Sequence, residues 1–307
     1  MKNKRVGRSG LEIGELGLGT LTWGRDTESE DAQAQIRSLL DAGGNAVDLS
    51  PAYCDGAGLD VMGDILSSGA PRDELALIVH AGITAEGVNT GRRALIQSVR
   101  QSLRRMGTTY ADVVMIAAPD PLTPIEETMQ AAADLVRWGD ALYIGLANFP
   151  TWLAATAAQY VTDHDLFELV ALGARYSILN REAEASAFLA HAGMSMFAYA
   201  PLAGGVLTGK YRHTIPPTSR AATGHLAWSV EHHLSDSQRS LTEAVTRAAD
   251  GLARTPADVS LAWSLGRDEV GAVFIGARTA SQFDQALALD LSPLPGPVVD
   301  ALNEVSR

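Results

Sequence analysis

The sequence lacks several features that define whole classes of protein. It has one cysteine, Cys54, in 307 residues, so no internal disulfide can form. No stretch approaches the roughly 20 apolar residues that a membrane helix needs, and no apolar segment of signal-peptide length follows the charged start. No Cys and His residues have the spacing of a metal site. We therefore expect a cytoplasmic protein with no structural metal and no membrane partner.

Basic residues are also scarce. The chain has 24 Lys and Arg against 36 Asp and Glu, a net charge of −12 that repels phosphate backbones and argues against a nucleic-acid partner. Hydrophobic residues make up 46% and charged residues 20%, which is typical of a globular protein. No linker-like break interrupts the chain, so we predict one domain over residues 1–307, while its oligomeric state is not readable.

Short apolar runs alternate with longer stretches of helical periodicity. In 89–106, for example, Leu95, Val99, Leu103 and Met106 share one helix face. The apolar runs read as buried strands at 16–19, 46–48, 75–79, 113–116, 141–146, 169–171, 195–199 and 272–275. Eight such units, each with a following helix, predict an α/β fold of the (β/α)8 TIM-barrel type.

Two further segments fit a barrel. Residues 5–13 look like a small N-terminal β-hairpin placed to close the barrel floor. The segment 212–235 is too long for a routine connection, which is typical of a binding loop. The rival fold is a doubly wound sheet, but after Gly17 and Gly19 its fingerprint needs a third glycine where Thr22 stands.

Barrel chemistry belongs at the carboxyl ends of the strands. Asp48 ends the second predicted strand, and Tyr53 follows in a loop with proline and glycine. With the Ile-Gly-Leu-Ala-Asn-Phe run at 144–149 and the glycine-rich run at 199–211, this pattern resembles the aldo-keto reductases, and the resemblance covers nearly the whole chain. The resemblance implies an enzyme that interconverts a carbonyl and an alcohol with NADPH, acting on a small organic or natural-product substrate.

The family's catalytic tetrad is Asp, Tyr, Lys and His, and only half of it is present. Asp48 and Tyr53 match, but His80 stands in place of the lysine and Ala117 in place of the histidine. A phenol has an ordinary pKa of about 10 and donates a proton best beside a cation, whereas an imidazole is charged only at mildly acidic pH. We therefore expect weak or altered activity, with Asp48, Tyr53 and His80 as the catalytic residues.

The cofactor side resembles the family more closely. An arginine near the 2′-phosphate favours NADP over NAD, and Arg278 has that position. Ala147 and Gly173, however, replace a serine and a glutamine that hold the nicotinamide amide in the family. The predicted cofactor-binding residues are Asn148, Tyr199, Ala200, Pro201, Leu202, Gly204, Lys210, Gly276, Arg278 and Gln282.

Other motifs give weaker evidence of function. The run from Gly204 to Lys210 is nearly a P-loop, but Tyr211 stands where a magnesium-binding Ser or Thr belongs. Cys54 has no supporting motif for a nucleophilic role. We expect Trp23 and Trp152 to line the substrate pocket.

Three functions are therefore open. The first is an NADPH-dependent reductase with an altered tetrad. The second is a non-redox enzyme, an isomerase, cyclase or dehydratase, that uses Asp48, Tyr53 and His80 for proton transfer. The third is a nucleotide-sensing pseudoenzyme. Fold alone does not separate them.

Overall fold

Eight parallel strands close into a barrel in the computed structural model, which describes residues 1–84, 86–184 and 186–306. Each strand contains or overlaps one of the predicted apolar runs, so the (β/α)8 prediction is confirmed and the doubly wound alternative is wrong. In order around the barrel, the strands are β3 (Leu16–Gly19), β4 (Ala46–Leu49), β5 (Ala76–Ala81), β8 (Ala111–Ile116), β9 (Ala141–Ala147), β10 (Leu169–Arg175), β11 (Ser195–Tyr199) and β12 (Val270–Gly276).

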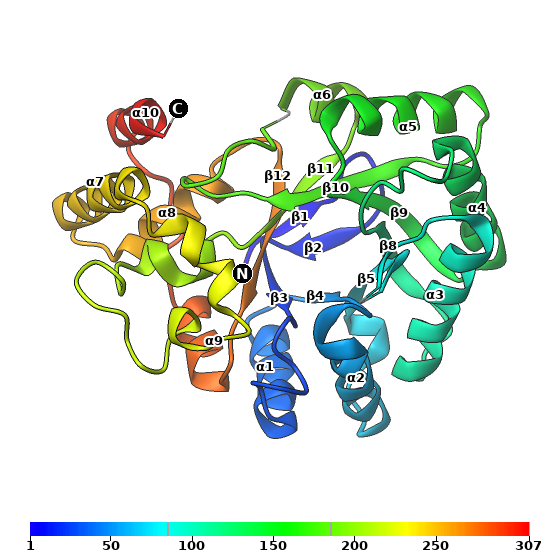
Figure 1. The fold of residues 1–307 in the computed structure, drawn as a ribbon, viewed down its shortest axis with the longest axis horizontal. Helices are drawn as coiled ribbons and strands as arrows, with labels where there is room; N and C mark the ends of the chain where they lie inside the picture. The colour runs from blue at the N-terminus through cyan, green and yellow to red at the C-terminus, as the bar shows by residue number, and fades with distance from the viewer. Residues whose placement is uncertain (85, 185, 307) are drawn as a thin grey trace.

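Helices form a ring outside the strands (Figure 1). The face predicted for residues 89–106 is the buried face of α3 (Arg92–Met106). The other helices are α1 (Ser29–Asp41), α2 (Ala57–Ser67), α4 (Ile125–Trp138), α5 (Thr151–Asp163), α6 (Ser186–Ala192), α7 (Asp236–Leu252), α8 (Pro256–Leu265), α9 (Ala280–Leu287) and α10 (Gly296–Val305). Among the described residues, no helix is long and apolar enough to cross a membrane.

The predicted N-terminal hairpin is formed by β1 (Asn3–Arg5) and β2 (Glu12–Gly14). Its side chains Val6 and Ile13 are fully buried in the inner core of the barrel, so the hairpin closes one end. Gly7 has a φ of 56°, and a Cβ there would lie 2.3 Å from the carbonyl oxygen of Gly193. Only glycine fits this close approach.

Small residues inside the barrel make room for large neighbours. A Cβ on Gly17 would lie 2.4 Å from the Phe274 ring, and one on Gly173 would lie 2.6 Å from the Tyr199 ring. Glycine in a strand commonly marks such a close approach of another group. The large side chains thus fill the interior of the barrel.

Short 3-10 turns and a second small hairpin complete the chain. The hairpin joins β6 (Ile83–Thr84) to β7 (Gly87–Val88). The long segment 212–235 lies between β11 and α7 and contains three of the turns. In chain order the turns are η1 (Tyr53–Gly56), η2 (Arg72–Glu74), η3 (Ala203–Thr208), η4 (Arg220–Ala222), η5 (Ala227–Ser229) and η6 (Glu231–His233).

Candidate active site

Strand alternation turns two polar side chains into the barrel mouth. Ala46 of β4, and Ala76 and Ile78 of β5, belong to the inner core. Because side chains alternate between the faces of a strand, Asp48 and His80 continue the inward row at the carboxyl ends. Asp48 is 2% exposed and His80 5%.

Asp48 joins the three predicted catalytic residues. Its Oδ1 accepts a hydrogen bond from Nε2 of His80 at 2.8 Å, and its Oδ2 accepts one from the Tyr53 hydroxyl at 3.2 Å. The imidazole therefore carries its proton on Nε2, and Nδ1 has no hydrogen-bond partner among the described residues. The structure thus brings Asp48, Tyr53 and His80 together, with the carboxylate shared between a phenol and an imidazole.

Tyr53 is held as a neutral phenol. Burial raises its pKa well above the ordinary value, and the charge and hydrogen bond of Asp48 raise it further, while Arg175 opposes the rise. The hydroxyl therefore keeps its proton at neutral pH, as a proton donor must. The turn that presents it, η1, is tight, because Cys54 and Asp55 both have left-handed backbones with φ of 48° and 55°.

The next inward positions around the mouth carry little chemistry. Ala117 follows β8 in register with inward Met115 and is 2% exposed, so it offers no side-chain donor. Asn148 has a φ of 58° and donates from its side-chain amide to the Ala117 carbonyl at 2.8 Å. Its own N–H donates to the Gly173 carbonyl at 2.8 Å, so Asn148 ties the ends of β8 and β10 together and keeps its Oδ1 and one side-chain N–H for a ligand.

Tyr199 leans across the strand ends. Its ring lies against Gly173 and 5.5 Å, centroid to centroid, from the His80 ring. Its hydroxyl is buried and has no hydrogen-bond partner within the described part of the chain. Burial raises its pKa well above the ordinary value, and the charge of Asp48 adds to the rise. The absence of a side chain at Gly173 therefore lets Tyr199 come close to the catalytic residues.

The glycine-rich loop after β11 folds largely onto itself. Ala200, Gly204 and Gly205 have left-handed backbones with φ of 51°, 65° and 96°. Ala200, Leu202 and Gly204 are predicted cofactor-binding residues, and backbone N–H groups of such a loop commonly bind phosphate. Several of them instead donate within the loop, including Ala203 to Ala200 and Gly205 to Leu202, both at 2.8 Å. Pro201, beside Leu202, has no N–H to offer.

Three cations gather beside this loop. Burial lowers the pKa of Lys210, and the charges of Arg220 and Arg278 lower it further, although Tyr211 opposes them. Arg220 donates to the Gly276 carbonyl at 3.3 Å. None of the three cations forms an ion pair with a carboxylate in the described part of the chain. Such a cluster attracts an anion, and Arg220 is a member that the sequence did not reveal.

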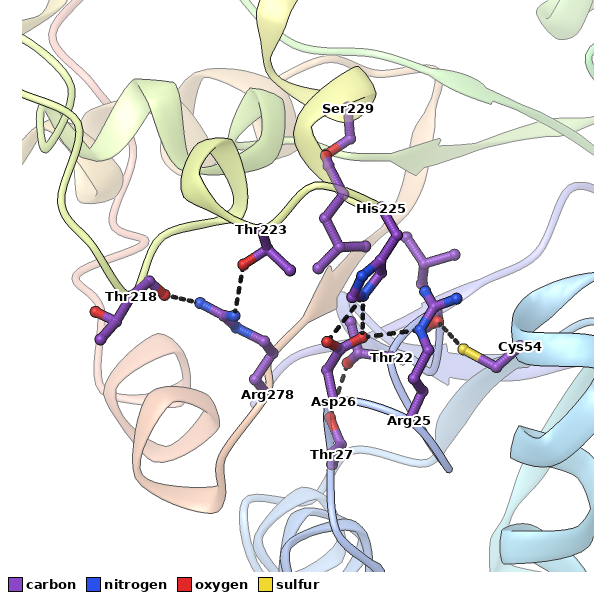
Figure 2. A network of polar contacts seen from close by, with 12 residues as sticks. Thr22, Arg25, Asp26, Thr27, Cys54, Thr218, Thr223, His225, Ser229 and Arg278 are labelled. Atoms are coloured by element: carbon purple, nitrogen blue, oxygen red, sulfur yellow. Dashed lines mark hydrogen bonds and ion pairs between the residues drawn. The ribbon is translucent and has the colours of Figure 1, made fainter.

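Arg278 reaches into the long segment 212–235 (Figure 2). Its guanidinium donates to Thr223 Oγ1 at 3.4 Å and to the Thr218 carbonyl, while its backbone N–H donates to Oε1 of Gln282 at 3.0 Å. The two predicted 2′-phosphate residues, Arg278 and Gln282, therefore lie together at the start of α9.

The same segment is attached to the loop after β3 by an ion pair. His225 Nε2 lies 2.9 Å from Asp26 Oδ1, and Arg25 donates to the same carboxylate (Figure 2). Burial pushes the pKa of Asp26 up, but these hydrogen bonds bring it below its ordinary value. The carboxylate is thus charged at neutral pH and holds the segment in place.

The two tryptophans predicted to line the substrate pocket differ. Trp23 is 0% exposed and donates from Nε1 to Gln35 Oε1 at 2.8 Å, so the prediction placed a core residue at the pocket. Trp152 is 70% exposed at the start of α5, after β9, and is free to meet a ligand.

Cys54 donates from Sγ to the Leu21 carbonyl at 3.3 Å, and burial raises the pKa of its thiol, which makes it a poor nucleophile.

No group of three or more His, Cys, Asp or Glu side chains within residues 1–84, 86–184 and 186–306 is arranged to hold a metal ion. The site is therefore built from a carboxylate, a phenol, an imidazole and nearby cations.

The chain is similar in sequence to known proteins along nearly all of its length. Residues 15–307 match the sequence model of the Aldo/keto reductase family. A probable voltage-gated potassium channel subunit beta from Oryza sativa subsp. japonica is 30% identical over 99% of this chain and 96% of its own length. A probable voltage-gated potassium channel subunit beta from Arabidopsis thaliana is 29% identical over 99% of this chain and 96% of its own length. A putative voltage-gated potassium channel subunit beta from Schizosaccharomyces pombe is 30% identical over 90% of this chain and 84% of its own.

Proposed function

This chain belongs to the Aldo/keto reductase family, and we propose that it interconverts a carbonyl and an alcohol of a small organic substrate with NADPH. The observation that carries the proposal is the Asp48 carboxylate at the barrel mouth, which is hydrogen-bonded to both Tyr53 and His80. A phenol and an imidazole on one carboxylate provide two groups that can donate or accept a proton at the substrate.

The residues present fit a phosphorylated dinucleotide. The unpaired cations Lys210, Arg220 and Arg278 suit its phosphates, and Arg278 with Gln282 suits the 2′-phosphate of NADPH. Asn148 retains Oδ1 for the nicotinamide amide. When bound, NADPH supplies the hydride that the side chains lack.

The proton is handled by this chain. Tyr53 donates it to the carbonyl oxygen, and the developing phenolate needs positive charge nearby. His80 hydrogen-bonds to Asp48 and not to Tyr53, and burial and the negative charge of Asp48 oppose ionisation of the phenol. The site therefore supports slow reduction, in keeping with its altered tetrad.

Two titrations test this proposal. NADPH and NADH are titrated separately while protein fluorescence is followed, and we expect tighter binding of NADPH. Aldehyde-dependent loss of NADPH absorbance is then compared between wild type and Tyr53→Phe, with Tyr160→Phe, whose hydroxyl accepts only from Gln130 Nε2, as the matched control. Failure of both nucleotides to bind would contradict the cofactor assignment.

A second candidate rests on the hydrogen bond between Asp48 and His80. A buried carboxylate that fixes the imidazole proton on Nε2 leaves Nδ1 as a base, an arrangement suited to isomerisation, cyclisation or dehydration without a cofactor. Wild type and His80→Gln distinguish the cases. A substrate turned over without any nucleotide, and only by the wild type, favours this alternative.

The relatives of this chain favour a third candidate. They are called potassium channel beta subunits, and the rice protein aligns with almost all of this chain. A protein that binds NADPH tightly but reduces carbonyls slowly suits a nucleotide sensor. Tight binding together with no turnover of any aldehyde by wild type would favour that role.

A further inference from the structure

Arg175 is a charged side chain that neither the cofactor framework nor the proton relay uses. It is the last residue of β10, is exposed, and stands opposite Tyr199 in the register with β11. Gly173, two residues earlier, lies under the Tyr199 ring. Since alternate residues share a face, Arg175 rises from the same row at the barrel mouth.

The guanidinium is supported by an aromatic ring. Its Cζ lies 5.1 Å from the ring centroid of Trp228, which is 52% exposed and belongs to the segment 212–235. Arg175 and Trp228 line a pocket whose other lining residues include Asn180, the cation Arg220, and Ala200 and Gly204 of the glycine-rich loop. A guanidinium over a ring keeps its N–H edge available for a planar anion such as a carboxylate.

Arg175 has no ion-pair partner among the described residues. By contrast, Arg181, farther along the same loop, is paired with Glu184 at 2.8 Å, and Arg72 with Asp112 at 2.8 Å. An unpaired arginine in a pocket, on a protein with a net charge of −12, marks a place where an anion is received.

Arg175 shares a pocket with Arg220 of the phosphate cluster but differs in the group that its charge influences. Arg220 and Arg278 act on Lys210, whereas Arg175 acts on the phenol of Tyr53. The cation therefore lies within electrostatic reach of the proton donor. A molecule whose carbonyl meets Tyr53 would place its own anionic group near Arg175.

We propose that Arg175 binds a carboxylate of the substrate, so that the preferred substrates are aldehydes or ketones that also carry a carboxylate. This inference rests on the proposed function for its carbonyl, but not for its anion site. A guanidinium and a carboxylate form paired hydrogen bonds, which adds orientation to affinity.

The test compares two probes, 4-carboxybenzaldehyde and its uncharged methyl ester, which differ in charge and by one methyl group. Binding is followed by tryptophan fluorescence, because Trp228 adjoins Arg175. The proteins are wild type, Arg175→Gln and, as control, Arg93→Gln, an exposed arginine on α3. We expect wild type to bind the carboxylate about 10-fold more tightly than the ester, and only Arg175→Gln to lose that preference.

Each other outcome has a defined meaning. Equal preference in wild type and Arg175→Gln, or no binding of either probe, overturns the inference. If Arg175→Gln instead weakens NADPH binding and leaves probe binding unchanged, the arginine serves the cofactor and the inference is wrong. Arg175-dependent binding of the carboxylate without NADPH oxidation supports the anion site and contradicts the proposed reductase. If wild type and Arg175→Gln reduce both probes equally well, the proposed reductase is supported and the anion site is contradicted.

Discussion

The two halves of the barrel mouth differ in how far they keep the family's chemistry. On the phosphate side, at the ends of β11 and β12, Lys210 and Arg278 stand where the resemblance expects them, and Arg220 adds a third cation. On the reaction side, at the ends of β4, β5 and β8, Asp48 and Tyr53 are joined by His80, and the position of Ala117 offers no donor.

The proposed function thus assigns nucleotide binding and reaction to separate residues. The phosphate side needs cations that no carboxylate neutralises. The reaction side needs a proton donor whose ionised form is stabilised, whereas burial and the charge of Asp48 both disfavour the ionised form of Tyr53. A change on one side is therefore expected to leave the function of the other side in place.

The largest effect is expected from Tyr53→Phe. Loss of a general acid lowers the catalysed rate by about 10²- to 10⁴-fold. The Kd for NADPH should stay near the wild-type value, because the hydroxyl contacts Asp48 and not the phosphate cluster. Steady-state rates and fluorescence titration check both parts. A large loss of NADPH affinity would show that the two sides are not separate.

The next largest effect is expected from Arg278→Gln, which changes the phosphate side and leaves the reaction side intact. Hydrogen bonds to charged groups contribute about 1.5–3 kcal/mol, so NADPH affinity should fall roughly 10- to 100-fold. NADH, which has no 2′-phosphate, should bind as before. Titration of both nucleotides measures this, with Arg93→Gln as control. Equal losses for the two nucleotides would mean that Arg278 does not contact the 2′-phosphate.

A smaller effect concerns the packing of Tyr199 on the reaction side. Gly173→Ala places a Cβ 2.6 Å from the Tyr199 ring, and overpacking of this kind costs about 1–3 kcal/mol in the free energy of unfolding. In a Tyr199→Ala background the same substitution should cost almost nothing. Urea unfolding of the four proteins gives the coupling energy. An unchanged cost in both backgrounds would show that the ring does not lie there.

The smallest effect is a loss of stability at alkaline pH. Tyr53 and Tyr199 have pKa values raised by burial, whereas an unfolded tyrosine ionises near pH 10. Above that pH the unfolded chain releases protons first, so the free energy of unfolding falls as pH rises. Urea midpoints between about pH 8 and 11 follow this fall. Tyr53→Phe should make it shallower, and an identical slope would contradict the raised pKa.

Much of the fold was predictable because strands and helices leave different hydrophobic patterns in the sequence. Continuous apolar runs indicate strands buried on both faces, and the pattern of 89–106 indicates a helix. The meeting of Asp48 and His80 also follows from the sequence, since neighbouring parallel strands end at one edge and both residues lie on inward positions.

Other parts of the site have no periodic signal. Arg220 and His225 belong to the segment 212–235, whose path depends on distant partners such as Asp26. Trp23 follows a strand end like a pocket residue, yet it is buried because Gln35 of α1 satisfies its N–H. The position of Tyr199 depends on the space at Gly173, and that contact arises only from tertiary packing.

The separation of the two sides is tested most directly by restoring the missing catalytic groups. The double variant His80→Lys, Ala117→His supplies a permanent cation and a hydrogen-bond donor to the reaction side and leaves Lys210, Arg220 and Arg278 unchanged. NADPH Kd and the rate of aldehyde reduction are measured on the same preparations of variant and wild type. We predict an unchanged Kd and a rate at least about 10-fold higher. A rate that does not rise while NADPH still binds, or a wild type already as fast as the variant, would contradict the account.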